Sequence, residues 1–91
     1  MMSVHQEISK HSSRQHAIVS EFLMLEQRRE NLIDITVEQC GKGLPFNVKE
    51  INEVSKQMNL LAQKGIVPQR KLITEHMVKE YVHKKNQASN L

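Results

Sequence analysis

Apolar positions recur at helical spacing through the first forty residues. Intervals of four and three residues, which place side chains on one face of a helix, join Val4, Ile8, His11, Gln15, Ile18, Phe22, Leu25, Arg29, Leu32 and Thr36. A second row widens this stripe on one side, at Val19, Leu23, Ile33, Val37 and Cys40. No Pro or Gly occurs before Gly41, so the pattern predicts one helix from about Ser3 to Cys40, roughly 55 Å long. The polar run from His11 to His16 leaves its continuity open, because serine competes with the helical backbone for hydrogen bonds.

Capping signals predict a second helix from Val48 to Lys64. Asn47 is a typical N-cap residue, and Glu50 three residues later completes a capping box. Gly65 suits the left-handed position that follows a helix, and Gly41 has the same predicted role after the first helix. The apolar face of this second helix carries Ile51, Val54, Met58 and Leu61.

A third helix is predicted to begin after Thr74, which is a favourable N-cap. Its apolar side chains are Met77, Val78, Tyr81 and Val82. The sequence therefore predicts an all-α fold, with one long N-terminal helix packed against two shorter helices that lie along its apolar stripe. We expect a single helical domain over residues 1–91, in which residues 1–16 and 87–91 fray or overhang.

Composition indicates a thin core. Aromatic residues make up only 3% of the 91-residue chain, so the core must be built from Leu, Ile, Val and Met. Association is a common remedy for a small core of this kind. The part of the first helix that the shorter helices do not cover carries Val4, Ile8 and Ile18. We therefore expect a homodimer formed through the first helix.

Four carboxylates recur at every fourth residue along the first helix, at Glu26, Glu30, Asp34 and Glu38. Like charges at this spacing cost roughly 0.2–0.5 kcal/mol per pair in an isolated helix. The basic C-terminal half, which includes Arg70 and Lys71, could lie against this row and offset the repulsion. These six residues are a candidate interaction surface for an unidentified protein partner. The alternative is a solvated face with local charge pairing.

The sequence predicts no catalytic, cofactor-binding or metal-binding set. Glu80 and His83 have the spacing of carboxylate-bridged metal sites in helical bundles, but such a site needs a second motif and two more glutamates. Glu7 and His11 offer two ligands, whereas zinc takes three or four. Cys40 closes the first helix, where the negative end of the dipole disfavours a thiolate. Metal binding by either pair stays open, and we expect a non-enzymatic protein without cofactors.

Nucleic-acid binding is the alternative function. The net charge of +3 is uneven, because residues 1–46 carry 5 basic and 6 acidic side chains while residues 47–91 carry 8 and 4. The connection between the second and third helices, about eight residues, is longer than the three or four of a helix-turn-helix. Carboxylates among the basic side chains also make this the weaker candidate. The basic cluster comprises Lys64, Arg70, Lys71, Lys84 and Lys85.

Three further observations indicate a soluble cytoplasmic protein. A single cysteine excludes an intramolecular disulfide. No apolar run approaches the ~18 residues that a membrane span requires. The first residues lack the apolar stretch of a signal peptide.

Several segments of the C-terminal half are similar to those of a known family. They are Ile51-Asn52-Glu53-Val54, Asn59-Leu60-Leu61-Ala62, Gly65-Ile66-Val67-Pro68 with Arg70-Lys71, and Ile73-Thr74 with Met77-Val78-Lys79-Glu80-Tyr81. The chain thus resembles small uncharacterised proteins from Bacillus-type bacteria that are known as a domain of unknown function. The resemblance implies a bacterial cytosolic protein with no assigned activity, and it carries no site residues over. Spacing and charge predict a helical interaction or regulatory module that acts as a homodimer.

Overall fold

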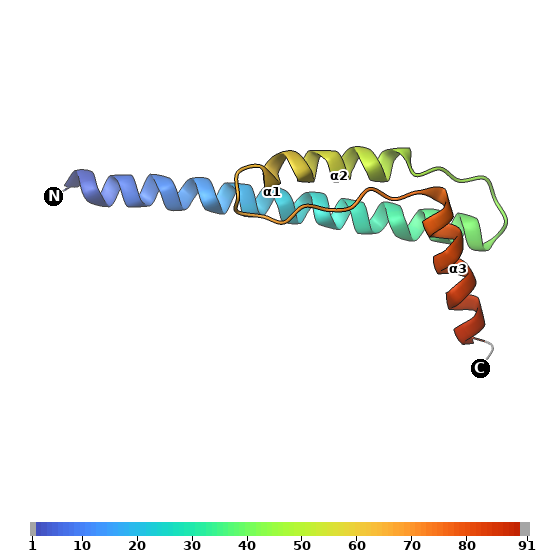
Figure 1. Cartoon of the computed structure of the whole chain (residues 1–91). Helices are drawn as coiled ribbons and strands as arrows, with labels where there is room; N and C mark the ends of the chain where they lie inside the picture. Colours follow the sequence, from blue (N-terminus) through green and yellow to red (C-terminus); the bar gives the residue numbers. More distant parts are fainter. Residues whose placement is uncertain (1, 90–91) are drawn as a thin grey trace.

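The described part of the chain, residues 2–89, forms three helices joined by two connections (Figure 1). The computed structural model describes the backbone of residues 2–89 and the side chains of residues 13–87. Helix α1 spans Met2–Gly41, α2 spans Lys49–Ala62 and α3 spans Glu75–Ser89, and the described residues contain no strand. The predicted all-α fold is therefore confirmed. Helix α1 is also continuous through residues 11–16, where the sequence had left a break open.

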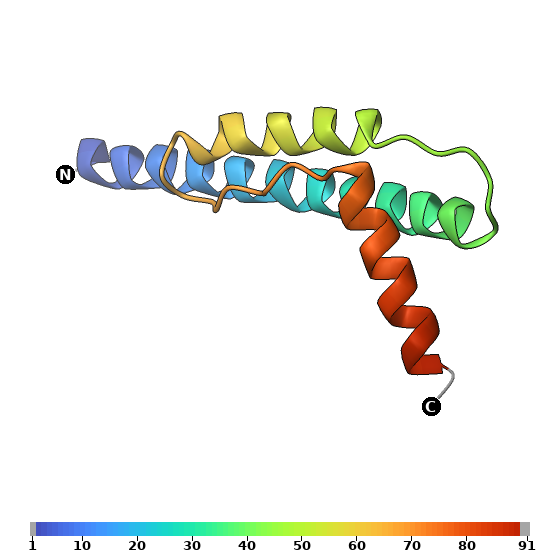
Figure 2. The ribbon, with the colours of Figure 1, turned by 45° about the vertical axis from the view of Figure 1, so that its right-hand side comes forward.

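Helix α2 lies antiparallel beside the C-terminal half of α1, as Figures 1 and 2 show. Residues 63–74, called the return segment below, then run back along α1. Helix α3 crosses α1 near the C-terminal end of α1 and projects away from that helix (Figure 2). Packing joins α1 to α2 and α1 to α3, whereas α2 and α3 do not contact each other within the described residues.

The course of α3 corrects the prediction that both short helices lie along the stripe of α1. Thr74 caps α3 as predicted, since its Oγ1 accepts a hydrogen bond from the Met77 N–H at 3.2 Å. Val78 is buried and Val82 half-buried, but the described residues from His83 to Gln87 are exposed and polar. The second half of α3 therefore offers no apolar stripe to pack on α1, and the helix leaves it.

The core lies between α1 and α2. Phe22, Val54 and Met58 form its buried centre, and the partly buried residues packed around them are Leu25, Leu32, Leu61 and Val67. Ile51 and Val78 are the other buried apolar residues of the described chain. The predicted stripe of α1 is confirmed between Ile18 and Thr36, because each of its members there is buried or half-buried.

The end of α1 corrects the predicted place of the left-handed glycine. Gly41 is the last residue of α1, whereas Gly43 has a φ of 73°. The Gly43 N–H donates to the carbonyl of Cys40 at 3.1 Å, and the Leu44 N–H donates to that of Gln39 at 2.9 Å. These two bonds form a Schellman motif with Gly43 at C′. Gly41 and Gly43 were both candidates for the left-handed residue after α1, and the prediction of Gly41 was wrong.

The ends of α2 follow the capping signals within two residues. The Oδ1 atom of Asn47 accepts a hydrogen bond from the Lys49 N–H at 3.1 Å, but the N-cap position of α2 is occupied by Val48, one residue after the predicted N-cap. The helix ends at Ala62 rather than Lys64, because the N–H groups of residues 63–65 bond three residues back. Gly65 has a φ of 78°, which confirms its predicted left-handed conformation.

The molecule is elongated. Its radius of gyration is 18.4 Å, whereas about 12 Å is typical of a compact chain of this length. Its principal extents are 65, 28 and 16 Å, and the long dimension follows α1 (Figure 1). Within the part of the chain that the structure describes, no helix has the length and apolar character needed to cross a membrane.

Candidate interaction surface

Two asparagines of α2 fasten the return segment. Asn59 Nδ2 donates to the Arg70 carbonyl at 3.0 Å, and its Oδ1 accepts from the Arg70 N–H at 2.7 Å. Asn52 forms the same pair of bonds with Ile73, at 2.9 and 2.8 Å. Seven residues of helix and three of extended chain both cover about 10 Å, so the two side chains match the two backbone positions. This clamp fixes where α3 begins.

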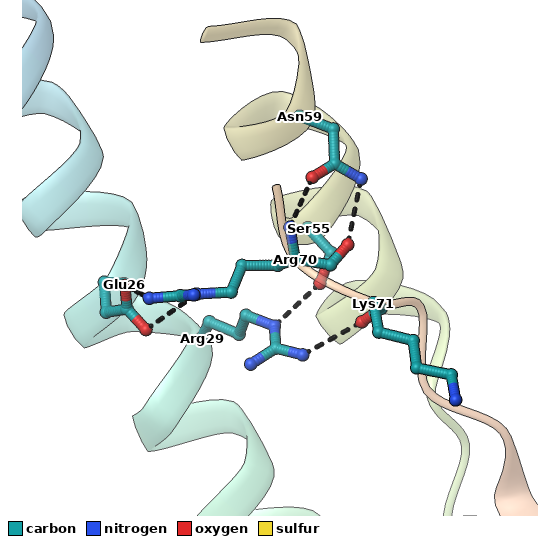
Figure 3. A network of polar contacts seen from close by, with 6 residues as sticks. All are labelled: Glu26, Arg29, Ser55, Asn59, Arg70 and Lys71. Atoms are coloured by element: carbon teal, nitrogen blue, oxygen red, sulfur yellow. Dashed lines mark hydrogen bonds and ion pairs between the residues drawn. The ribbon is translucent and has the colours of Figure 1, made fainter. Parts of the chain in front are cut away.

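Arg70 connects the return segment to α1, as Figure 3 shows. Its Nε donates to one carboxylate oxygen of Glu26 at 3.1 Å, and its Nη2 donates to the other at 2.6 Å. The guanidinium also lies over the ring of Phe22, 5.3 Å from its centroid. The bidentate hydrogen bonds from Arg70 to Glu26 raise the pKa of Arg70 above its ordinary value. Of the two basic residues named with the acidic row, Arg70 thus contacts one of the four carboxylates, Glu26.

Arg29 links α1 to α2 and to the return segment (Figure 3). Its Nε donates to Ser55 Oγ on α2 at 2.8 Å, and its Nη2 donates to the carbonyl of Lys71 at 3.0 Å. Burial lowers the pKa of Arg29, and the neighbouring charge of Arg70 lowers it further. The side chain of Lys71 itself is exposed.

The other carboxylates of the acidic row face solvent. Glu30, Asp34 and Glu38 are exposed, and Glu38 forms an ion pair with Lys42 at 2.9 Å. The hydrogen bond from Lys42 lowers the pKa of Glu38. The ion pairs between described residues leave Glu30 and Asp34 without a cationic partner. Their use in binding a partner stays a prediction.

The predicted basic cluster is dispersed over the molecule. Arg70 is engaged by Glu26, and Lys64 lies just beyond the end of α2. Lys84 and Lys85 lie near the C-terminal end of α3, far from the end of α2 in both views (Figures 1 and 2). The fold therefore does not gather these cations on one surface.

The candidate metal ligands lie apart from any larger ligand set. Glu80 and His83 are both exposed, and Glu80 lies 3.8 Å from the ring nitrogen of His76. Among the described residues, no group of three His, Cys, Asp or Glu side chains is placed to hold an ion. The side chains of Glu7 and His11 lie outside the described residues.

An apolar groove follows the junction of α1 and α3. It has a volume of about 240 Å³, and we call it the corner; its lining residues are Ile33, Val37, Ile73, Met77, Val78 and Tyr81. A second hollow of about 380 Å³ adjoins it, where Asp34, Glu38 and Lys85 add charge to the lining. Tyr81 borders both hollows and is 56% exposed. The corner thus presents an exposed aromatic ring above an apolar floor.

Helix α1 exposes further apolar side chains near its middle. Val19 is 38% exposed and Leu23 is 59% exposed, although the sequence pattern placed both on the side of the buried stripe. Exposed aliphatic residues that lie close together are a feature of interaction surfaces.

Sequence reasoning did not assign a role to Arg29, Asn52 or Asn59. A signal was present, because Arg29 occupies a position of the apolar stripe and the two asparagines are two helical turns apart on α2. A polar residue at a buried position needs a hydrogen-bond partner, and here the partners are Ser55 and the backbone of the return segment.

Comparison with known proteins places the chain in a family. The family model described as "Protein of unknown function (DUF2533)" matches residues 2–84. The chain is also 48% identical over 82 residues to the "Uncharacterized protein YpbS" of Bacillus subtilis (strain 168), an alignment that covers 90% of this chain and 96% of that protein. No solved structure matches the chain. The chain therefore belongs to the DUF2533 family of proteins of unknown function, which confirms the resemblance seen in its C-terminal segments.

Proposed function

We propose that the protein is a non-enzymatic, cytoplasmic interaction module that acts as a homodimer through α1. The observation that carries the proposal is the extent of α1. The end of α2 meets α1 near Arg14 and Ile18, where Lys64 lines a shared hollow. Residues 2–13 of α1 extend beyond this point, as Figure 2 shows.

An uncovered helical segment of this length needs support. Twelve residues form little more than three turns, and isolated helices of that size are marginal in water. In this protein, helical stability comes from the packing of an apolar stripe, as it does for the part of α1 between Ile18 and Thr36. A second copy would supply the same kind of packing to the uncovered segment.

The polar groups of the described core support a structural rather than a catalytic role. Thr36 and Ser55 are buried, and each hydroxyl donates to a carbonyl four residues earlier in its own helix. The described groups with shifted pKa values are Arg29, Arg70 and Glu38, and each takes part in an ion pair or a hydrogen bond between elements or along a helix. None of these three residues lines the apolar corner, and Glu38 alone among them lines the hollow that adjoins it.

Light scattering during size exclusion tests the proposal. We expect a mass twice that of the single chain, 10.6 kDa, at micromolar concentrations. Ile8→Glu should shift this mass toward one chain, whereas Lys56→Glu on the exposed face of α2 should not. A single-chain mass of the unmodified protein at every concentration would overturn the proposal.

The nucleic-acid alternative stays a prediction with less support, because the fold disperses its five cations. Filter binding at low and moderate salt tests it, since contacts with phosphates produce a steep salt dependence. Retention that does not depend on salt, or none at all, would remove the alternative.

A further inference from the structure

We propose that α1 pairs antiparallel with α1 of a second copy, so that residues 2–13 of each copy lie in the corner of the other. This inference rests on the proposed homodimer and specifies its interface. The occupant of the corner is thus the N-terminal segment of an identical chain. A two-fold axis that crosses α1 at its middle relates the two copies.

Val19 and Leu23, which share a face of α1 with Ile33 and Val37, mark the place of this axis, whereas the exposed Met24 and Ile35 lie on another face. Val19 and Leu23 are one helical turn apart, and their midpoint is residue 21. Helix α1 runs from residue 2 to residue 41, so its own midpoint falls at the same place. In an antiparallel pair centred there, Val19 of each copy faces Leu23 of the partner subunit, and each exposed side chain is covered by the other. A patch that covers itself in this way is what a two-fold interface requires.

The lengths of the segments agree with this register. With residue 21 at the axis, residues 2–13 lie opposite residues 29–40 of the partner subunit. That stretch includes Ile33 and Val37, which form the floor of the corner. The segment is about 18 Å long and α3 about 22 Å, so one can lie across the other within the corner. Tyr81 and Met77 of α3, with Ile73 at the end of the return segment, would then close over the N-terminal segment of the partner.

Charge favours the antiparallel orientation over the parallel one. Residues 2–20 carry two basic and one acidic side chain, whereas residues 21–41 carry two basic and five acidic side chains. Antiparallel pairing places the first half of α1 against the acidic second half of its partner, twice per dimer. Parallel pairing would instead place the two acidic rows side by side.

One contact in this register involves described residues on the open side of α1. His16 and Glu30 are both exposed, and they lie on the same face as Val19 and Leu23, at spacings of three, four and seven residues. With the axis at residue 21, His16 lies opposite Glu26 of the partner subunit and within one helical turn of Glu30 of the partner subunit. The imidazole can donate a hydrogen bond to a carboxylate in this position. Glu30 has no cationic partner among the described residues, so it is available for this contact.

A charge exchange tests the interface. The first variant, Ser12→Glu with His16→Glu, should set like charges against Glu30 of the partner subunit. The second, Glu30→Lys with Asp34→Lys, should place lysines opposite an already basic half of α1. We expect each variant alone to raise the dimer dissociation constant about tenfold or more. An equal mixture should recover a dissociation constant close to the wild-type value. The interface has two symmetry-related halves, and in the mixed dimer one half gains opposite charges while the other half keeps its wild-type residues.

Controls separate this inference from the homodimer itself. Circular dichroism must show wild-type helicity for both variants, and Glu53→Lys with Lys56→Glu on the exposed face of α2 should leave the dissociation constant unchanged. If the wild-type protein is dimeric but either variant dimerises normally, or the mixture does not recover, the interface is wrong while the homodimer stands. If the wild-type protein is monomeric, both proposals are overturned.

Discussion

Arg29 lies on the face of α1 that packs against α2, at a position where the surrounding pattern is aliphatic. It is accommodated because its guanidinium reaches Ser55 on one side and the carbonyl of Lys71 on the other. The aliphatic stem can pack along the core while the charged head keeps its hydrogen-bond partners. One side chain therefore links α1, α2 and the return segment.

Replacement of Arg29 by alanine should destabilise the protein by about 1–3 kcal/mol, because it removes charged hydrogen bonds and buried packing together. The exposed neighbour Arg28 is a matched control, and Arg28→Ala should change stability by less than about 0.5 kcal/mol. Urea unfolding monitored by circular dichroism measures both. Equal unfolding midpoints for the two variants would show that the contacts of Arg29 contribute nothing.

At the scale of residues, the sequence predicted charge pairing but only part of its geometry. The regular spacing of four carboxylates left two alternatives open, a solvated face or basic residues lying against it, and Arg70 does lie against Glu26. Spacing along one helix cannot show which carboxylate the return segment passes, since that depends on where Asn59 holds it. Glu30, Asp34 and Glu38 thus stay exposed although they share the same period.

The end of α1 offers a test at the scale of elements. Gly43 adopts a φ of 73°, so Gly43→Ala should destabilise the protein by about 1 kcal/mol. Gly41 is helical, and a Cβ atom there would meet only Val82 Cγ1, at 4.0 Å. Gly41→Ala should therefore stabilise the protein by about 0.5–1 kcal/mol. Thermal unfolding of both variants checks the assignment, and the opposite signs would contradict the Schellman motif.

The return segment gives a second test at this scale, because it has no helical or strand pairing of its own. The Arg70 N–H depends on Asn59 Oδ1 for its hydrogen bond. We expect Asn59→Ala to speed hydrogen exchange at the Arg70 amide by about tenfold or more, since each 1.4 kcal/mol of lost protection corresponds to that factor. Gln57→Ala, on the exposed face of α2, is the control. Unchanged exchange at Arg70 in the Asn59 variant would mean that the clamp does not hold the segment.

Caps and turns were the most predictable elements of this chain. Thr74 and Gly65 act as their residue types suggest, because a side-chain oxygen or a left-handed backbone meets a purely local need. The other two predicted positions were displaced by one or two residues, since Val48 rather than Asn47 is the N-cap of α2 and Gly43 rather than Gly41 is left-handed. The return segment was not predictable in the same way. Its backbone bonds to Asn52 and Asn59, which precede their partners by 21 and 11 residues, and no local signal reports a contact of that kind.

At the scale of the whole molecule, the sequence predicted the set of helices but not the angle of α3. Apolar spacing indicates which face of a helix is buried, and it led to the expectation that both short helices lie along α1. The angle follows instead from the clamp that ends the return segment at Ile73 and from the exposed, polar surface of α3 beyond Val82. This angle opens the corner on which the proposed dimer depends.

Distances between spin labels would distinguish the two orientations of a dimer. With the axis at residue 21, equivalent positions are separated along α1 by twice their offset from that residue, so two Met24 positions lie about 9 Å apart along the axis and two Lys42 positions about 63 Å apart. Met24 and Lys42 are exposed, and Cys40→Ser removes the native thiol. We expect a short distance for the label introduced by Met24→Cys and a distance of 60 Å or more, ~63 Å along the axis, for Lys42→Cys. Parallel pairing would give two short distances, because each position would then lie level with its own copy on the adjacent helix.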